Sequence, residues 1–159
     1  MAVVMILSVM VLVGVGNARR GEGVKADFLE FYDALQTLKL RANLGQQYGG
    51  SSMQVLTFTI GNPSSYTVNG ITKTFKNGSR IMQVNTTTTS GTAVAIYFIP
   101  QGTSYEGTIP PSNGKFVTIG GIGVTSPVTT IIIRGPSGTG ASYTVTITGT
   151  GYYIEKIDR

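Results

Sequence analysis

The feature that most constrains this chain is a change of hydrophobic periodicity, which divides its 159 residues into two unlike parts. Up to residue 44, apolar side chains recur at helical spacing, whereas from residue 49 apolar and hydroxyl-bearing residues alternate with the period of two typical of strands. The pattern predicts a long helix followed by an all-β domain. We expect the helical region to cover 1–46 and the β domain to cover 47–159.

The chain opens with sixteen residues, MAVVMILSVMVLVGVG, whose only polar side chain is Ser8. This stretch is shorter than the roughly 20 apolar residues that span a bilayer, so it suits a signal-peptide core or the start of a longer helix. A signal peptide carries positive charge before its core, and here no Lys or Arg precedes it. We expect the segment to belong to the mature protein; cleavage after Ala18, at the small-x-small triplet Gly16-Asn17-Ala18, is the alternative.

Four glycines follow closely upon one another at positions 14, 16, 21 and 23. Each glycine inside a helix costs about 1 kcal/mol relative to alanine. We therefore expect the helix to bend, stretch or melt locally over this short zone.

A second helical pattern follows over residues 24–44. One apolar stripe is spaced by alternating steps of four and three residues, at Val24, Phe28, Phe31, Leu35, Leu38 and Ala42. The charged residues are expected on other faces: Asp27, Glu30, Asp33, Lys39 and Arg41. Gly45 is a natural C-terminal stop. A continuous helix over 1–44 would reach about 65 Å, longer than the β domain can cover, so its exposed part must meet membrane or other copies.

The remaining residues predict short antiparallel strands separated by turns. Asn69-Gly70, between 66–68 and 71–75, is a strong signal for a hairpin with a type I′ turn. The expected strands are 55–60, 66–68, 71–75, 80–85, 93–99, 115–119, 128–134, 142–148 and 151–157. The fold class predicted is therefore α+β, with a long hydrophobic N-terminal helix and an antiparallel, immunoglobulin-like β-sandwich.

Composition argues against an enzyme. The chain has no Cys, which removes thiolate nucleophiles, and no His, which removes the commonest general base and the commonest metal ligand. No cofactor or metal site is expected. The acids of the β region are Glu106, Glu155 and Asp158, and we expect no catalytic pair among them. The net charge is +5, but the basic residues are scattered, so nucleic acid is not expected as the main partner.

Two triplets match the acceptor pattern for N-linked sugars, beginning at Asn77 and Asn85. Asn77 also lies where a turn is needed. In an exported protein we expect a glycan on at least one of these two residues, which would make the chain a glycoprotein.

An apolar start, a glycine-containing zone, an amphipathic continuation and a β domain together resemble the type IV pilin superfamily, and most closely its archaeal pilins and archaellins. Bacterial members begin with Phe and have Glu at the fifth position, where this chain has Met1 and Met5; the archaeal branch often lacks that acid. The resemblance implies a cell-surface pilus, a homopolymer used in adhesion. Its subunit waits in the cytoplasmic membrane, loses a charged leader, and requires an assembly ATPase and a membrane platform.

In this interpretation the helix supplies the filament core. The residues expected to pack there are Val3, Val4, Ile6, Leu7, Val9, Met10, Val11, Leu12, Val13, Phe28, Phe31, Leu35 and Leu38. We expect Phe31→Asp to prevent assembly while leaving the β domain folded. The alternative function is a membrane-tethered or secreted β-sandwich that binds carbohydrate, and it predicts a chain that stays monomeric.

Overall fold

A computed structural model of the chain describes residues 2–47, 53–61, 64–100, 115–124, 128–136, 141–148 and 153–158. Side chains are described from residue 21 onward, apart from those of 115, 116, 153, 154 and 156–158. Within these ranges the fold is α+β, as predicted, with one helix and two antiparallel sheets.

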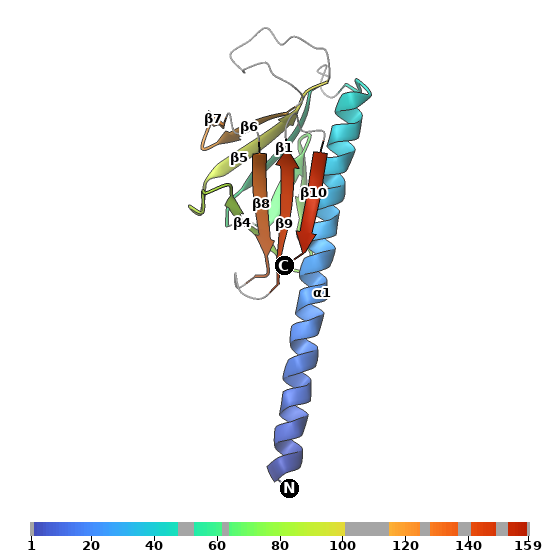
Figure 1. Cartoon of the computed structure of the whole chain (residues 1–159), viewed down its shortest axis with the longest axis vertical. Helices are drawn as coiled ribbons and strands as arrows, with labels where there is room; N and C mark the ends of the chain where they lie inside the picture. The colour runs from blue at the N-terminus through green and yellow to red at the C-terminus, as the bar shows by residue number, and fades with distance from the viewer. Residues whose placement is uncertain are drawn as a thin grey trace.

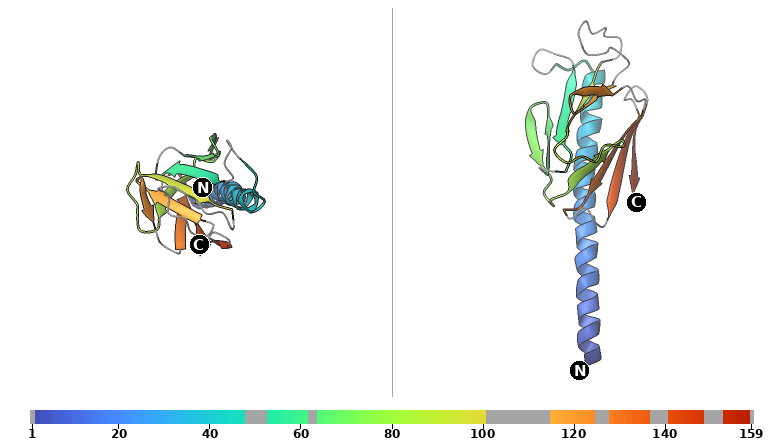
Figure 2. Two further views of the ribbon diagram at one scale, coloured as in Figure 1. Left: turned by 90° about the horizontal axis from the view of Figure 1, so that it is seen from above. Right: turned by 90° about the vertical axis from the view of Figure 1, so that its left-hand side faces the viewer.

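The helix α1 spans Ala2–Asn43 without interruption. It ends as expected at Gly45, whose φ of 64° is left-handed, and the N–H of Gln46 closes the helix on the carbonyl of Arg41 at 3.0 Å. The second half of α1 lies against the β domain, whereas its first half extends alone beyond that domain (Figures 1 and 2).

The expected bend at the four glycines is absent, since α1 runs straight through them. Gly23 has a packing reason to be glycine. A Cβ at this position would lie 3.0 Å from Cγ and Oδ1 of Asn77. This glycine therefore allows a loop to approach the helix closely, which the sequence pattern alone does not reveal.

Six strands form the first sheet, in the order β3-β2-β1-β5-β6-β7. Their bounds are β1 Gln54–Thr59, β2 Ser65–Val68, β3 Ile71–Thr74, β5 Ala93–Phe98, β6 Lys115–Ile119 and β7 Ile122–Val124. The second sheet has the order β10-β9-β8-β4. Its strands are β4 Arg80–Val84, β8 Val128–Arg134, β9 Ser142–Thr148 and β10 Tyr153–Asp158.

The hairpin predicted at Asn69-Gly70 is confirmed, with φ angles of 46° and 79° at the two turn residues. A second hairpin of this kind joins β6 to β7 through Gly120 and Gly121, with φ of 61° and 80°. The sequence analysis did not predict β7, because three residues with a central glycine give too short an alternation. Residues 101–114, between the expected strands 93–99 and 115–119, lie outside the described residues.

One apolar core joins the helix to both sheets. On β1, β5, β8 and β9 every second residue is buried, as the period of two predicts. Phe31 of α1 meets Tyr66 of β2 edge to face, with ring centroids 5.1 Å apart. Phe28, one turn earlier, stacks at 5.0 Å on Tyr143 of β9 in the other sheet. The second half of the helix is therefore part of the domain's core.

Candidate functional site

The expected filament-core residues divide into two groups in the structure. Phe28, Phe31, Leu35 and Leu38 are 0% exposed within a single chain. Their apolar stripe is covered by the chain's own sheets, so the expectation that these four pack between subunits is wrong. A side chain that is already enclosed has no surface to offer a neighbour.

The other nine, from Val3 to Val13, belong to the first half of α1, whose helical backbone extends past the β domain (Figure 1). Their side chains lie outside those that the structure describes. Among the residues whose side chains are described, no helix is long and apolar enough to cross a membrane.

The junction between helix and β domain is built around Asp27, which is only 2% exposed. The sequence pattern placed this acid on a polar face, and the structure corrects that expectation. Its carboxylate accepts hydrogen bonds from the backbone N–H of Asn77 at 3.1 Å, the side-chain amide of Asn77 at 3.0 Å and the N–H of Ser79 at 3.3 Å. Three donors satisfy the buried charge and bind the β3–β4 turn to α1.

A second, weaker set of contacts lies one turn further along the helix. Glu30 forms ion pairs with Lys73 of β3 at 3.8 Å and with Lys76 at 3.9 Å. Lys76 is largely exposed, so its pair contributes little to stability. The hydrogen bonds that Asp27 accepts from Asn77 and Ser79, which we call the Asp27 clamp, are the stronger link between the helix and the β3–β4 turn.

The two predicted glycan acceptors differ in their surroundings. The Nδ2 of Asn77 donates to Asp27, and the side chain packs against Gly23. The nitrogen atom to which a glycan would be attached is therefore already hydrogen-bonded within the fold. Asn85 lies in a turn after β4, with φ of 52°, and its Oδ1 accepts the N–H of Thr130 at 2.9 Å. Its side chain is partly exposed.

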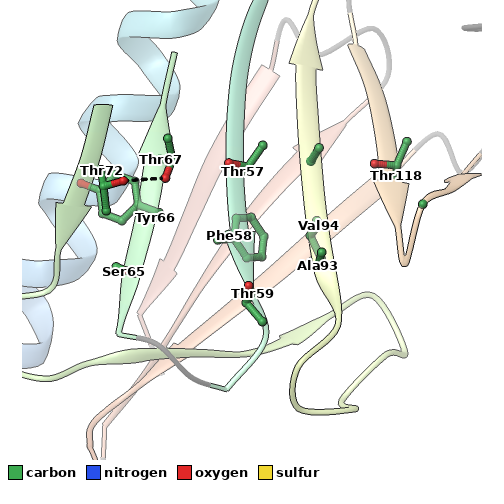
Figure 3. Close-up of a pocket in the computed structure, with 12 residues that line it drawn as sticks. Thr57, Phe58, Thr59, Ser65, Tyr66, Thr67, Thr72, Ala93, Val94 and Thr118 are labelled. Carbon is green, nitrogen blue, oxygen red and sulfur yellow. Dashed lines mark hydrogen bonds between the residues drawn. The ribbon is translucent and has the colours of Figure 1, made fainter. Parts of the chain in front are cut away.

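A hollow of about 460 Å³ lies on the outer face of the six-stranded sheet, and the sequence analysis did not anticipate it. The strand register brings small and hydroxyl-bearing residues into one row across five strands: Thr72, Thr67, Thr57, Ala95 and Thr118. Figure 3 shows these threonines on neighbouring strands, with a 3.1 Å hydrogen bond between the hydroxyls of Thr67 and Thr72. None of the described residues that line the hollow is charged.

This hollow presents hydroxyl groups on a floor of small side chains. Such a surface can donate and accept hydrogen bonds without attracting either sign of charge. It does not suit a phosphate backbone, whose binding needs Lys or Arg. The alternation in β1 places Thr57 and Thr59 on the face opposite the buried Phe58, but only the strand register shows which residues lie beside them.

Of the acids weighed as catalytic candidates, only Glu155 has a described side chain. Glu155 is exposed on β10, Asp158 ends the same strand, and Glu106 lies outside the described residues. Among described residues no group of three or more acids could hold a metal ion. Burial, and then the charges of Glu30, Asp27 and Asp33, raise the pKa of the Tyr66 phenol above its ordinary range.

Searches with protein-family models, among curated proteins and among solved structures returned no match for this chain.

Proposed function

We propose that the chain is a structural subunit, not an enzyme, that polymerises through its N-terminal helix into an extracellular type IV-like pilus of the archaeal kind, used in adhesion and surface attachment. One observation carries the proposal. The helix Ala2–Asn43 has its second half in the core of the β domain, while its first half, apolar in sequence, extends beyond that domain (Figure 1).

The physical argument begins with the extending half. Apart from Ser8, residues 2–16 are apolar, so every face of a helix over this stretch is mostly apolar and its exposure to water is unfavourable. Burying one Leu, Ile or Val side chain contributes about 1.5–3 kcal/mol. Lipid can cover the segment in a membrane, and neighbouring helices can cover it in a polymer. A head-to-tail contact that does not close then gives an open helical filament.

The Asp27 clamp supports the same proposal from the other end of the helix. When a filament is under tension, the force on the helix of a subunit must reach its β domain without detaching the helix from that domain. Asp27 with Asn77 and Ser79, together with the enclosed ring of Phe31, joins the two parts as one body. In the proposed filament the β domains form the outer surface, and the subunit waits in the cytoplasmic membrane before assembly.

We also propose that the β domain is an immunoglobulin-like sandwich. The two antiparallel sheets contribute residues to one common core, which supports this interpretation. The chain crosses between the sheets from β3 to β4 and back from β4 to β5, as sandwiches commonly do. An experimental structure with measured angles between the sheets would test the assignment.

Electron microscopy of filaments sheared from the native cells, combined with mass spectrometry of their subunits, tests the proposed function. We expect thin filaments that contain this chain, with α1 in the interior and the β domain outside. An assembly ATPase and a membrane platform should be encoded by the same cells. Isolation of the chain only as single particles, in membrane or medium, would contradict the proposal.

The second candidate is carbohydrate binding, and the threonine-lined hollow is the observation that favours it. Sugar hydroxyls can exchange hydrogen bonds with a neutral floor of this kind. A glycan array probed with the full chain in detergent tests it, with Thr57→Val and Thr67→Val as variants that keep shape but lose the hydroxyl. Binding that both variants abolish would support this function, and no binding by the unmodified chain would exclude it for the glycans on the array.

A further inference from the structure

We propose that the groove between α1 and the β2–β3 hairpin receives the extending helix of a second copy of this chain, with Arg19 and Arg20 of that copy beside Glu30 and Asp33. This inference rests on the proposed self-assembly, and it specifies which surfaces of two neighbouring copies are in contact. The groove is distinct from the hollow on the outer face of the sheet.

The groove has a volume of about 620 Å³. Leu29, Glu30, Asp33 and Arg41 line it on one face of α1, and Ile71 and Lys73 line it on the hairpin. Along α1 the lining residues Leu29, Asp33, Thr37 and Arg41 are each four residues apart, so they form a single stripe. Ile71 is 67% exposed, which leaves a large apolar side chain at the open rim. A surface of apolar walls with charged rims suits an amphipathic or apolar helix.

Two acids, Glu30 and Asp33, and two bases, Arg41 and Lys73, line the groove, and the two acids lie about one turn apart on α1. A basic side chain of a partner would fit beside these two acids. Among the described residues, Glu30 forms ion pairs with Lys73 and Lys76, at 3.8 and 3.9 Å. Asp33 is exposed and forms no ion pair with another described residue. A cation that approaches along α1 would therefore meet one acid without a partner and one that is loosely held. Complementary charges of this kind set the register of an interface more than its affinity.

The extending helix has the matching pattern. Its apolar stretch, up to Gly16, is followed after two intervening residues by the adjacent basic pair Arg19-Arg20. For parallel helices, Arg19 beside Glu30 requires an axial shift of eleven residues, and Arg20 beside Asp33 a shift of thirteen. At 1.5 Å per residue the offset between copies is roughly 17–20 Å. The shift of thirteen residues brings Val13 of one copy level with Ala26 of the next, at the start of the groove.

A charge exchange tests the contact. We expect Asp33→Arg and Arg20→Asp each to lower the yield of filaments about tenfold, because each places like charges together. The two substitutions in one chain should restore the yield to within about twofold, because opposite charges again face each other. Glu155→Arg makes the same charge change at an exposed acid on β10 and should leave the yield unchanged.

Disulfide trapping gives an independent measurement, since the chain has no cysteine. Mixed filaments of Asp33→Cys and Arg20→Cys chains should form a dimer on oxidation, because a disulfide requires Cα atoms within about 7 Å. Ile122→Cys, at a position on β7 whose side chain is 74% exposed, replaces Asp33→Cys in the control and should give no dimer.

The outcomes separate the inference from the function on which it rests. If unmodified chains form filaments but the exchange restores nothing and no disulfide forms, the groove is not the contact, while self-assembly stands. If unmodified chains form no filaments and the extending helix is found only in lipid, both proposals are overturned.

Discussion

Asp27 in α1 and Asn77 in the β3–β4 turn are fifty residues apart in the chain, yet the carboxylate of the first accepts the side-chain amide of the second at 3.0 Å. The same carboxylate also accepts the N–H of Asn77, so the contact is bidentate from the side of the turn. It joins the helix to the β domain through a buried charge, and it adds to the ring contacts of Phe28 and Phe31 with the two sheets.

Replacing Asp27 tests the strength of this junction. In Asp27→Asn the new amide faces donors of Asn77 and Ser79, and a buried N–H is left without an acceptor. We expect a loss of about 2–3 kcal/mol in the free energy of unfolding, as for hydrogen bonds to charged groups. Urea denaturation of the full chain in detergent measures it. Glu22→Gln, at an exposed helix position, is the matched control, and equal effects of the two changes would contradict the prediction.

Two glycines of α1 should respond oppositely to alanine. Around Gly21 an added Cβ meets nothing within 4 Å, so Gly21→Ala should stabilise the chain by about 0.5–1 kcal/mol through helix propensity. At Gly23 the added atom lies 3.0 Å from Asn77, whose side chain cannot move without breaking its bond to Asp27. Gly23→Ala should therefore destabilise. Thermal unfolding of both variants measures the difference, and a shared rise in melting temperature would refute the explanation.

Much of this fold could be predicted from periodicity. Helical spacing up to residue 44 and alternation beyond it gave the α+β class, and Asn69-Gly70 gave a turn with the φ angles expected. These features are local, since each depends on residues a few positions apart. The same is true of the stop at Gly45, which needs only a left-handed residue after the last turn.

What could not be predicted depends on contacts between distant segments. Asp27 looked like a solvated helix acid, because nothing near it in the sequence reveals the donors at 77 and 79. The hollow required the register of five strands, which alternation within one strand does not supply. The stripe through Phe31 was located correctly, but the surface that covers it was misassigned to other subunits.

That correction changes the expected effect of Phe31→Asp. The ring lies against Phe58, Tyr66 and Phe75, so an aspartate there would be an unpaired charge in the core of the subunit. We expect loss of at least about 4 kcal/mol and an unfolded β domain, in place of a folded subunit that fails to assemble.

Leu40→Asp is the matched comparison for this change. Leu40 is 58% exposed on the same helix, so the subunit should keep its fold. Circular dichroism of the two full-length variants in detergent distinguishes them. A β signal retained in Phe31→Asp would mean that the ring is dispensable for the fold.

The acceptor asparagines give a prediction about modification. A glycan on Asn77 would need space beside Gly23 and would disturb the bond to Asp27, so the folded chain should carry none there. Asn85, in a partly exposed turn, should carry the glycan if the chain is modified at either residue. Mass spectrometry of glycopeptides from native material compares the two, with Asp27→Ala as a variant that frees Asn77. A glycan found on Asn77 of the unmodified chain would contradict this assignment.

The buried phenol of Tyr66 predicts how stability changes in alkali. Its pKa is raised above the ordinary value of 10.0, first by burial and then by the charges of Glu30 and Asp27. Above pH 10 the unfolded chain releases this proton while the folded chain retains it, so rising pH favours unfolding by up to about 1.4 kcal/mol per pH unit. Tyr66→Phe should flatten that slope, whereas Tyr32→Phe, which loses a hydroxyl bonded to Gln36, controls for a missing hydroxyl elsewhere. Urea midpoints measured from pH 9 to 11 test this prediction. If the midpoint falls equally steeply with pH in the unmodified chain and in Tyr66→Phe, another group causes the loss of stability in alkali.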